Sequence, residues 1–524
     1  MVKTGESTGR HAFLVASGIL ISRIVGLVRQ RVFSHYFGQL DEADAFYAAF
    51  RIPNLLQNLF GEGVLSASFI PVYARLLAEG DEEDSGRVAG AVGAILALAT
   101  SVMVLAGVLL TPYLIWVIAP GFEGAKRELT IRLARIFFPG AGLLVFSAWS
   151  LGILNSHRKF FLSYTAPVIW NAAMIATMVA FRRKDLATLA VYLAWGSVVG
   201  SALQFFVQVP TVLRLARKLR LRLDTQAANV RAVLRNFAPV FVSRGVVQIS
   251  GYVDQLIASK LGEGAVTALT NAQSIYMLPV SLFGMAVSAA ELPAMSSALG
   301  TDTEIAVRLR QRLNAGLRQI AFFIVPSAMA FFALGDVVAG GVYQTGKFTH
   351  QNSVYTWGII AGSAVGLLAS TLGRLYASTY YALRDTRTPL RYASLRVALT
   401  VGLGYLCALP LPRWLGIDPH WGAAGLTASA GVAGWVEFTL LRRTLNARIG
   451  ATGVPAELVA RLWGAAALGA AAAWGIKLAI AGARPEVTAI LVLVPYGVIY
   501  FAVTYLLRVE ECGALFAKLA RLRR

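Results

Sequence analysis

Apolar segments of about twenty residues or more recur along almost the whole chain, and no other feature restricts its fold as strongly. A helix of that length is what crosses the hydrocarbon core of a bilayer. Only 14% of the 524 residues are charged, against about 25% in soluble domains. The alternating blocks of about ten residues that mark an outer-membrane barrel are absent. The sequence therefore predicts an all-α, polytopic membrane protein.

We count fourteen apolar segments, and the charges between them test that count. The segments are 12–36, 44–74, 88–118, 131–155, 161–181, 187–213, 232–259, 265–298, 317–340, 353–383, 389–410, 421–441, 460–482 and 487–507. With the N-terminus inside, the cytoplasmic connections carry about three times as many Lys and Arg residues as the outer ones, as transmembrane topology requires. The pattern predicts fourteen transmembrane helices with both termini in the cytoplasm, although the basic cluster at 182–184 lies on the predicted outer side. The first segment lacks a small-residue cleavage site, so we expect it to be retained.

The chain repeats itself weakly on either side of a basic connection at 214–235. SRIV at 22–25 is echoed by SRGV at 243–246, and the Pro- and Gly-marked stretch at 50–71 is echoed at 276–293. Internal repeats with interrupted helices at matching places are typical of transporters built from two bundles. We therefore expect two pseudo-repeated six-helix bundles and two extra C-terminal helices followed by a basic tail. The expected bounds of these three parts are 1–217, 218–450 and 451–524.

Ten basic residues but only six acidic ones fall inside the predicted spans. Arg23 and Arg29 share a polar stripe about 140° wide on the first span, and Arg51 lies in the second. A guanidinium at membrane depth costs at least ~2.5 kcal/mol, so these side chains should face protein or water. Ion pairing with Asp44 and Glu62 is one explanation, but it leaves an excess of positive charge. Because Arg presents a planar fork of donors that suits phosphate, we expect a phosphate-bearing ligand in a cationic cavity.

The second span carries the residues that would let it bend. Pro53 removes a backbone donor from the helix, and Gly61 and Gly63 weaken it further along. Two bundles that rock against each other need such a segment, so we expect a flexible helix here, with a static kink as the alternative.

Signatures of an enzyme or of a nucleic-acid binder are missing. The net charge of +21 lies mostly in short connections between spans, which argues for membrane orientation and against a nucleic-acid partner. The run GVYQTGKF (341–348) resembles a phosphate loop, but Phe348 stands where Ser or Thr must hold magnesium. The histidines are scattered, and Cys407 and Cys512 form no metal spacing. We expect a transporter without an ATP-driven domain in this chain.

The motif-bearing segments together resemble one family. The run SRIVGLVRQRVFSHYFG, continued by DAFYAAFRIPNLLQNLFGEGVLSASFIPVYARLL, is similar to the MurJ (MviN) lipid II flippases of the multidrug/oligosaccharidyl-lipid/polysaccharide exporter superfamily. The resemblance is densest over 22–77 and recurs in LPVSLFGMAVSAAELP, YQTGKFT and YYALRDTRTP. It implies twelve exporter helices plus two more. It also implies transport of the undecaprenyl-pyrophosphate-linked peptidoglycan precursor, lipid II, from the inner to the outer leaflet of the bacterial cytoplasmic (inner) membrane.

The family's functional positions carry over to particular residues of this chain. The resemblance implies substrate contacts at Arg23, Arg29, Arg51 and Asn54, and ion-pairing or conformational roles at Asp44, Pro53 and Glu62. Gln57 and Ser274 stand where many members have a basic residue, and Arg244, or else Arg374 and Arg396, is a candidate replacement. The two added helices, 460–507, are implied to help form a groove for the lipid tail.

The resemblance also bears on cofactors and partners. Some members use a sodium site, for which Asp254 and Thr400 are candidate ligands here; sodium or the membrane potential would then drive transport, and no other cofactor is expected. The expected partners are lipid II and membrane lipids, with the cell-wall synthesis machinery as a candidate.

Other functions stay open at this point. A sibling flippase for another lipid-linked oligosaccharide would have the same cavity charge. A drug or cation antiporter of the same superfamily is disfavoured, because a cationic substrate requires buried acids. A membrane glycosyltransferase should show a pair of acids in a loop for metal–sugar phosphate chemistry, and a scaffold would not need the arginines of the first two spans.

Overall fold

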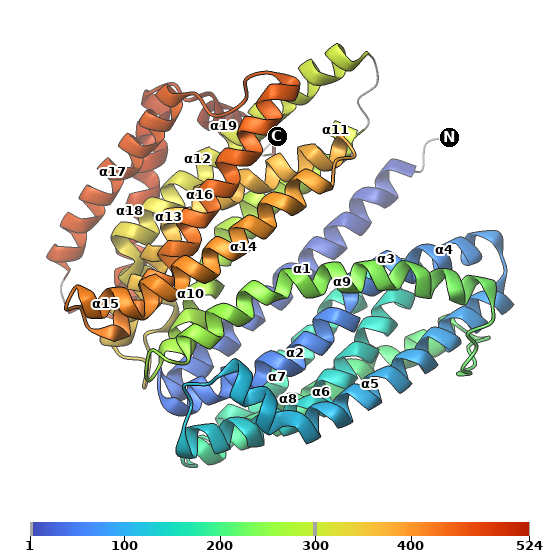
Figure 1. Ribbon diagram of the computed structural model, residues 1–524. Helices are drawn as coiled ribbons and strands as arrows, with labels where there is room; N and C mark the ends of the chain where they lie inside the picture. The colour runs from blue at the N-terminus through green and yellow to red at the C-terminus, as the bar shows by residue number, and fades with distance from the viewer. Residues whose placement is uncertain (1–3, 297–300, 481, 523–524) are drawn as a thin grey trace. The chain divides into compact units, whose positions relative to one another are not determined.

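The computed structural model describes residues 4–296, 301–480 and 482–522, and these contain helices and turns but no β-strand (Figure 1). In chain order the α-helices are α1 (Thr4–Phe37), α2 (Asp41–Phe60), α3 (Glu62–Ser68), α4 (Ile70–Glu79), α5 (Glu82–Ile118), α6 (Gly124–Ser156), α7 (Phe160–Ala180), α8 (Leu186–Leu215), α9 (Ala228–Ala258), α10 (Ala265–Pro279), α11 (Ala286–Ser296), α12 (Asp302–Tyr343), α13 (His350–Ala382), α14 (Arg387–Ala408), α15 (Pro410–Trp414), α16 (Gly422–Ile449), α17 (Ala456–Ala479), α18 (Pro485–Leu506) and α19 (Glu510–Leu522). A π-helix, η1 (Val280–Met285), joins α10 to α11, and a short 3-10 helix, η2 (Pro419–Trp421), precedes α16.

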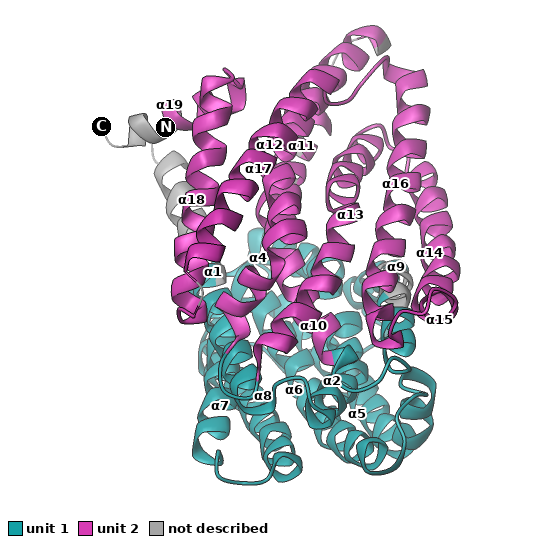
Figure 2. Cartoon of the chain, turned by 90° about the vertical axis from the view of Figure 1, so that its left-hand side faces the viewer, with its two compact units in different colours: residues 1–266, 345–347 teal, residues 267–344, 348–524 magenta. Residues whose placement is uncertain are grey.

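The helices form two compact units, which Figure 2 colours separately. Unit 1 comprises Met1–Val266 together with the short segment Thr345–Lys347, and unit 2 comprises Thr267–Gln344 and Phe348–Arg524. In unit 1, α6 packs against α2, α5 and α8, while α1 lies on α7. In unit 2, α13 packs between α12 and α16, α14 lies on α16, and α17 and α18 lie on α12.

Eleven helical stretches of the described residues are long and apolar enough to cross a membrane. The three long helices outside that set are α1, α2 and α9, which have 34, 20 and 31 residues. All three are long enough to cross a bilayer, so their length does not separate them from the others. The prediction of an all-α polytopic membrane protein is confirmed, whereas the count of fourteen spans stays a prediction.

Two predicted segments are interrupted helices. The segment 44–74 contains α2, α3 and α4, with Gly61 in an extended conformation (φ −86°, ψ −157°) between the first two. Pro53 lies inside α2 without ending it. The segment 265–298 contains α10, the π-helix η1 and α11. Proline and glycine residues in the sequence therefore predict which segments are interrupted. The structure shows that the first interruption is an extended glycine and the second is a π-helix.

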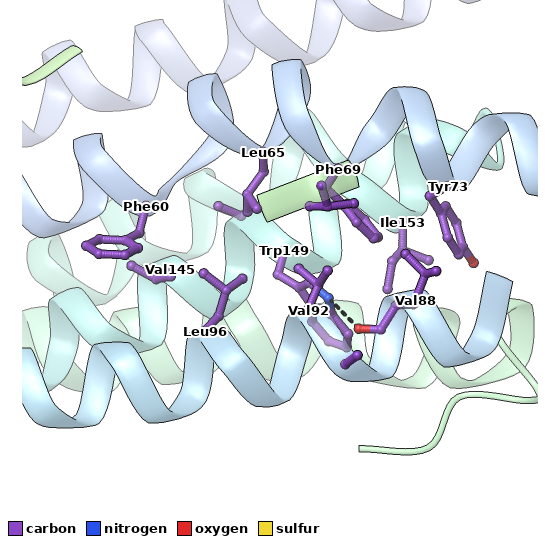
Figure 3. Packing of buried hydrophobic residues seen from close by; sticks show 14 of the residues in the cluster. Phe60, Leu65, Phe69, Tyr73, Val88, Val92, Leu96, Val145, Trp149 and Ile153 are labelled. Atoms are coloured by element: carbon purple, nitrogen blue, oxygen red, sulfur yellow. Dashed lines mark hydrogen bonds between the residues drawn. The ribbon is translucent and has the colours of Figure 1, made fainter. Parts of the chain in front are cut away.

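A large cluster of buried apolar side chains packs the helices of unit 1 together. Figure 3 shows side chains from α2 to α6 in it, among them Phe60, Phe69, Val92 and Trp149. The indole N–H of Trp149 donates to the carbonyl oxygen of Ala89 over 3.2 Å, so the largest side chain of this cluster has its polar atom satisfied.

The basic connection between α8 and α9 lies against α5. A Cβ at Gly90 would overlap the backbone of Arg220, so only glycine allows this close approach. The Arg87 guanidinium donates to the Asp224 carboxylate over 2.7 Å and holds the pKa of that carboxyl below its ordinary value. The connection is thus fixed to unit 1 by both backbone contact and charge.

Candidate functional site

The polar stripe of α1 lies partly on α7, and its small residues explain how closely the two helices approach. A Cβ at Gly18 would lie 2.9 Å from the Cβ of Tyr164, and one at Gly26 would lie 3.9 Å from the side-chain oxygen of Asn171. Small residues at such contacts let two helix backbones approach each other closely. This edge of the stripe therefore serves helix packing.

Arg29 follows the small residues on the same edge of the stripe. Its guanidinium carbon lies 4.9 Å from the centre of the Trp170 ring, and one N–H contacts the sulfur of Met174 at 3.6 Å. The side chain is half-buried, whereas Arg23 on the other edge of the stripe is exposed. An aromatic face holds a guanidinium in place and leaves its charge intact.

Arg51 is held by α9 in a similar way. Its guanidinium carbon lies 5.6 Å from the centre of the Tyr252 ring, and the Tyr252 hydroxyl donates to the Arg51 carbonyl oxygen over 3.1 Å. A Cβ at Gly251 would overlap the guanidinium, so α9 leaves room for it. No acidic side chain pairs with Arg51 among those the structure describes. Asn54, one turn further along α2, is half-buried.

Asp44 forms a buried ion pair at the start of α2. The carboxylate is fully buried, and one of its oxygens accepts from the Lys126 ammonium and from the Gly264 N–H, each over 2.8 Å. Lys126 also lies 2.7 Å from Asp41. The sequence analysis does not identify this pairing, because Asp44 and Lys126 lie on different helices. The available signal was an acid in a span together with a lysine at the start of another span.

Several other predicted residues lie apart from these contacts. The side chains of Glu62 and Arg244 lie outside the described part of the structure. Asp254 is half-buried on α9 in unit 1, while Thr400 is buried on α14 in unit 2. Among the described residues, no group of three or more His, Cys, Asp or Glu side chains could hold a metal ion.

The candidate replacements for the missing family arginines differ in their surroundings. Arg396 on α14 pairs with Glu437 on α16 at 3.0 Å. Arg374 on α13 is exposed, and Gln57 and Ser274 are half-buried.

Two of the resembling motifs form turns. In YYALRDTRTP, Asp385 accepts from the backbone N–H groups of Arg387 and Thr388 and pairs with Arg448 at 2.7 Å. These contacts, led by the Thr388 backbone hydrogen bond, lower the pKa of Asp385 to about 2. In YQTGKFT, Gly346 has a positive φ of 54° and lies against the His35 carbonyl, where a Cβ would overlap it.

An apolar groove of about 320 Å³ lies within unit 2. Residues of α10, η1, α12 and α18 line it, among them Leu278, Phe283, Phe331, Leu493, Tyr496 and Phe501. Of the two added C-terminal helices, α18 contributes directly to the lining. Unit 1 thus holds two half-buried guanidinium groups against aromatic rings, and unit 2 has an apolar groove of its own.

A family model provides the first comparison with known proteins. The model described as lipid II flippase MurJ matches residues 33–504 of this chain.

Individual proteins are similar over most of their length. A probable lipid II flippase MurJ of Rhizobium tropici is 33% identical over 445 residues, which covers 83% of this chain and 80% of that protein. One of Bdellovibrio bacteriovorus is 30% identical over 520 residues, covering 97% and 96%. Among solved structures, a lipid II flippase MurJ in an inward closed conformation aligns with a TM-score of 0.78 at 22% identity, over 94% of this chain and 98% of that one. An inward-facing multidrug transporter of the MATE family aligns with a TM-score of 0.68 at 17% identity, over 83% and 98%.

Proposed function

The chain belongs to the lipid II flippase MurJ family, and on that premise we propose that it moves lipid II from the inner to the outer leaflet of the bacterial inner membrane. The family consists of transporters of a lipid-linked precursor, and the activity proposed is transport without covalent chemistry. The observation that carries the proposal is the pair of half-buried guanidinium groups, Arg29 and Arg51, that α1 and α2 hold against aromatic rings.

The head group is proposed to bind at these arginines. A pyrophosphate offers several anionic oxygens, and a guanidinium can donate two parallel N–H bonds to such a group. The rings of Trp170 and Tyr252 fix the positions of the two guanidinium carbons without neutralising them. Arg23, which is exposed on the same stripe, adds positive charge, and Asn54 and Arg244 are proposed further contacts.

The lipid tail is proposed to lie in the apolar groove of unit 2. Its lining by Phe283, Phe331 and Phe501 suits a branched prenyl chain, because apolar surface gains free energy when it is removed from water. The head group would cross through the protein while the tail stays in an apolar environment throughout.

Movement is proposed to use the interrupted second span. The extended residue Gly61 separates α2 from α3, so the two helices can change their angle at one residue. Rocking of the two six-helix bundles, 1–217 and 218–450, would then give alternating access, with both termini in the cytoplasm. The Asp44–Lys126 pair would be part of the changing contacts, and Glu62 a second acid there.

The driving force is proposed to be a sodium gradient or the membrane potential. Asp254 and Thr400 are the proposed sodium ligands, because carboxylate and hydroxyl oxygens suit a hard cation. The cell-wall synthesis machinery is a proposed partner that would take up the product outside.

The test is complementation in a bacterium depleted of its own lipid II flippase, with lipid II in the outer leaflet measured directly. We compare the unchanged protein, a triple variant Arg23→Ala, Arg29→Ala, Arg51→Ala, and a control triple variant Arg182→Ala, Arg183→Ala, Lys184→Ala. The control removes the same number of positive charges from exposed positions. All three are compared at equal abundance in the membrane.

We expect the unchanged protein and the control to restore outer-leaflet lipid II and the site variant to fail. If the well-expressed unchanged protein leaves lipid II inside, the substrate assignment is wrong and another lipid-linked oligosaccharide becomes the leading candidate. If all three restore it equally, transport stands but the proposed head-group site is wrong.

A further inference from the structure

Helix α12 has two backbone defects, and side chains of other helices donate to carbonyl groups at or just before each of them. Pro326 lies inside the helix and has no N–H to donate to Phe322, one turn earlier. Further along, Leu334 has non-helical dihedral angles (φ −127°, ψ 18°). A buried carbonyl that has lost its helical donor needs another one.

The first defect is satisfied from α18. The Tyr500 hydroxyl donates to the Phe322 carbonyl oxygen over 2.6 Å, and the Tyr496 hydroxyl donates to the Pro326 carbonyl oxygen over the same distance. Both tyrosines are buried, so these hydrogen bonds lie away from water. They bind α18 to the proline-interrupted part of α12.

Side chains of α17 and α13 donate to carbonyl groups just before the second defect. Trp474 on α17 donates its indole N–H to the Ala333 carbonyl oxygen, and Trp357 on α13 donates to that of Phe332, each over 2.9 Å. A Cβ at Gly335 would overlap the Trp357 ring, so glycine is required beside the bend. The bend at Leu334 is therefore held by donors from two neighbouring helices.

An ion pair lies next to this bend. The Lys477 ammonium on α17 lies 2.6 Å from one oxygen of Asp336, and the side chains are only 21% and 6% exposed. Lys477 also lies 4.2 Å from the centre of the Trp474 ring and 5.9 Å from that of Trp357. The second oxygen of Asp336 is buried and has no hydrogen-bond partner. An ionisable pair inside a span is costly to keep, which makes a functional role the default expectation.

The bent part of α12 is also a wall of the apolar groove. Phe331 precedes the bend, Val338 follows it, and both line the groove together with Tyr496 and Tyr500 of α18. The angle at Leu334 therefore sets the distance between two parts of the same wall. Whatever fixes that angle fixes the width of the groove.

We propose that Asp336 and Lys477 are positioning residues for the lipid tail: with Trp357 and Trp474 they form a clamp that holds the α17–α18 hairpin on the bent part of α12 and keeps the groove wide enough for a long prenyl chain. The proposal depends on the proposed function in one respect, which is that the apolar groove binds the lipid tail. The clamp acts through the wall of the groove and touches neither the head group nor the cationic residues of unit 1.

The test compares the affinities of the purified full-length protein for undecaprenyl phosphate and farnesyl phosphate, which share a head group and differ in tail length. The variants are Asp336→Asn, Lys477→Gln, the double variant, Lys477→Arg and Trp474→Phe. The double variant matters because it removes both charges and leaves no buried charge unpaired. The control is Arg484→Gln, an exposed cation at the start of α18 on the same hairpin.

We expect the preference for the undecaprenyl tail to fall about tenfold in Asp336→Asn, Lys477→Gln and the double variant, which corresponds to burying one or two fewer methylene groups. Lys477→Arg should keep most of the preference, Trp474→Phe should lose part of it, and Arg484→Gln should be unchanged. Affinity for farnesyl phosphate should stay within about twofold in all.

Two results overturn the proposal. If the variants lose affinity for both phosphates equally, the pair stabilises the fold and does not position the tail. If the tail preference is unchanged, the clamp does not set the groove. Failure of the unchanged protein to move lipid II while it still prefers the long tail would count against the proposed function alone, because binding is measured without transport.

Discussion

The two stretches that echo each other in sequence, 50–71 and 276–293, interrupt their helices in different ways. In the first, α2 continues past Pro53 and ends only at Phe60, and Gly61 separates it from α3. In the second, α10 ends at Pro279 and a π-helix of six residues follows without a break. The first interruption is a joint between two helices, and the second is a widened turn inside one continuous span.

The glycines of the two stretches explain the difference. A Cβ at Gly61 would overlap the backbone carbonyl of Gln57, in the preceding helix α2. A Cβ at Gly284 would overlap the side-chain methyl of Thr371, on α13. The first interruption therefore depends on the local backbone, while the second depends on a neighbouring helix. Similar sequence patterns thus place a weak point in each half, but different surroundings decide what it becomes.

The largest effect should come from closing the joint in the first stretch. Gly61→Ala puts a methyl group on a backbone oxygen that cannot rotate away, so α2 or α3 must shift. We expect it to lower the free energy of unfolding by about 3 kcal/mol and to abolish transport. Thermal unfolding in detergent and the complementation assay measure the two effects. Gly402→Ala, in α14, is the control, because a Cβ there would have no neighbouring atom within 4 Å; equal loss in both variants would contradict a special role for Gly61.

The second stretch should be less sensitive and should be open to rescue. Gly284→Ala meets only a side-chain methyl, so we expect a loss of about 1–2 kcal/mol. Thr371→Ser removes that methyl and keeps the hydroxyl that donates to the Leu367 carbonyl oxygen over 2.6 Å. The double variant should regain most of the lost stability in thermal unfolding. If the serine gives no rescue, the π-helix does not depend on α13.

A smaller difference between the halves concerns two turns. Arg158 follows α6, and Arg384 follows α13. The two are as far apart in sequence as Pro53 and Pro279, so they occupy matching places in the repeat. Only the second turn has an aspartate, Asp385, in the next position. Its lowered pKa means that Asp385 stabilises the native state when ionised. That contribution is complete above its ordinary pKa of 3.8 and is lost as the pH falls to about 2. The melting temperature of Asp385→Asn should therefore be below that of the unchanged protein at pH 5 and should converge with it near pH 2. A difference in melting temperature that stays the same from pH 5 to pH 2 would contradict a stabilising role of the ionised carboxylate.

The smallest effect tests whether the two turns are equivalent. Arg158 and Arg384 each have a positive φ of 59°, a conformation that side chains other than glycine adopt at a cost. Arg158→Gly and Arg384→Gly should each raise the free energy of unfolding by about 0.5–1 kcal/mol. Arg217→Gly, in the connection after α8, is a control that should not stabilise. A gain at only one of the two turns would show that the repeat does not extend to them.

The candidate site could be predicted in part. Arg23, Arg29 and Arg51 could be singled out because a charge in an apolar segment is conspicuous in any sequence. Their partners could not, since Trp170 and Tyr252 lie far along the chain on other spans and look like ordinary span aromatics. The pairing of Asp44 with Lys126 was missed for the same reason. Asp336 and Lys477 lie far apart in the sequence on different helices, and only the structure shows that they form a pair.

The sequence by itself determined that this chain is an all-α membrane protein of the exporter type, which residues carry charge into the spans, and where its helices are weak. These properties depend on composition and on spacing along one helix, both of which are local. Only the tertiary structure decided whether a weak point becomes a joint or a π-helix, and which ring, carbonyl or carboxylate each charged side chain contacts. These outcomes depend on atoms brought together from distant parts of the chain, and the cost of leaving a buried polar group unsatisfied selects among the possible arrangements.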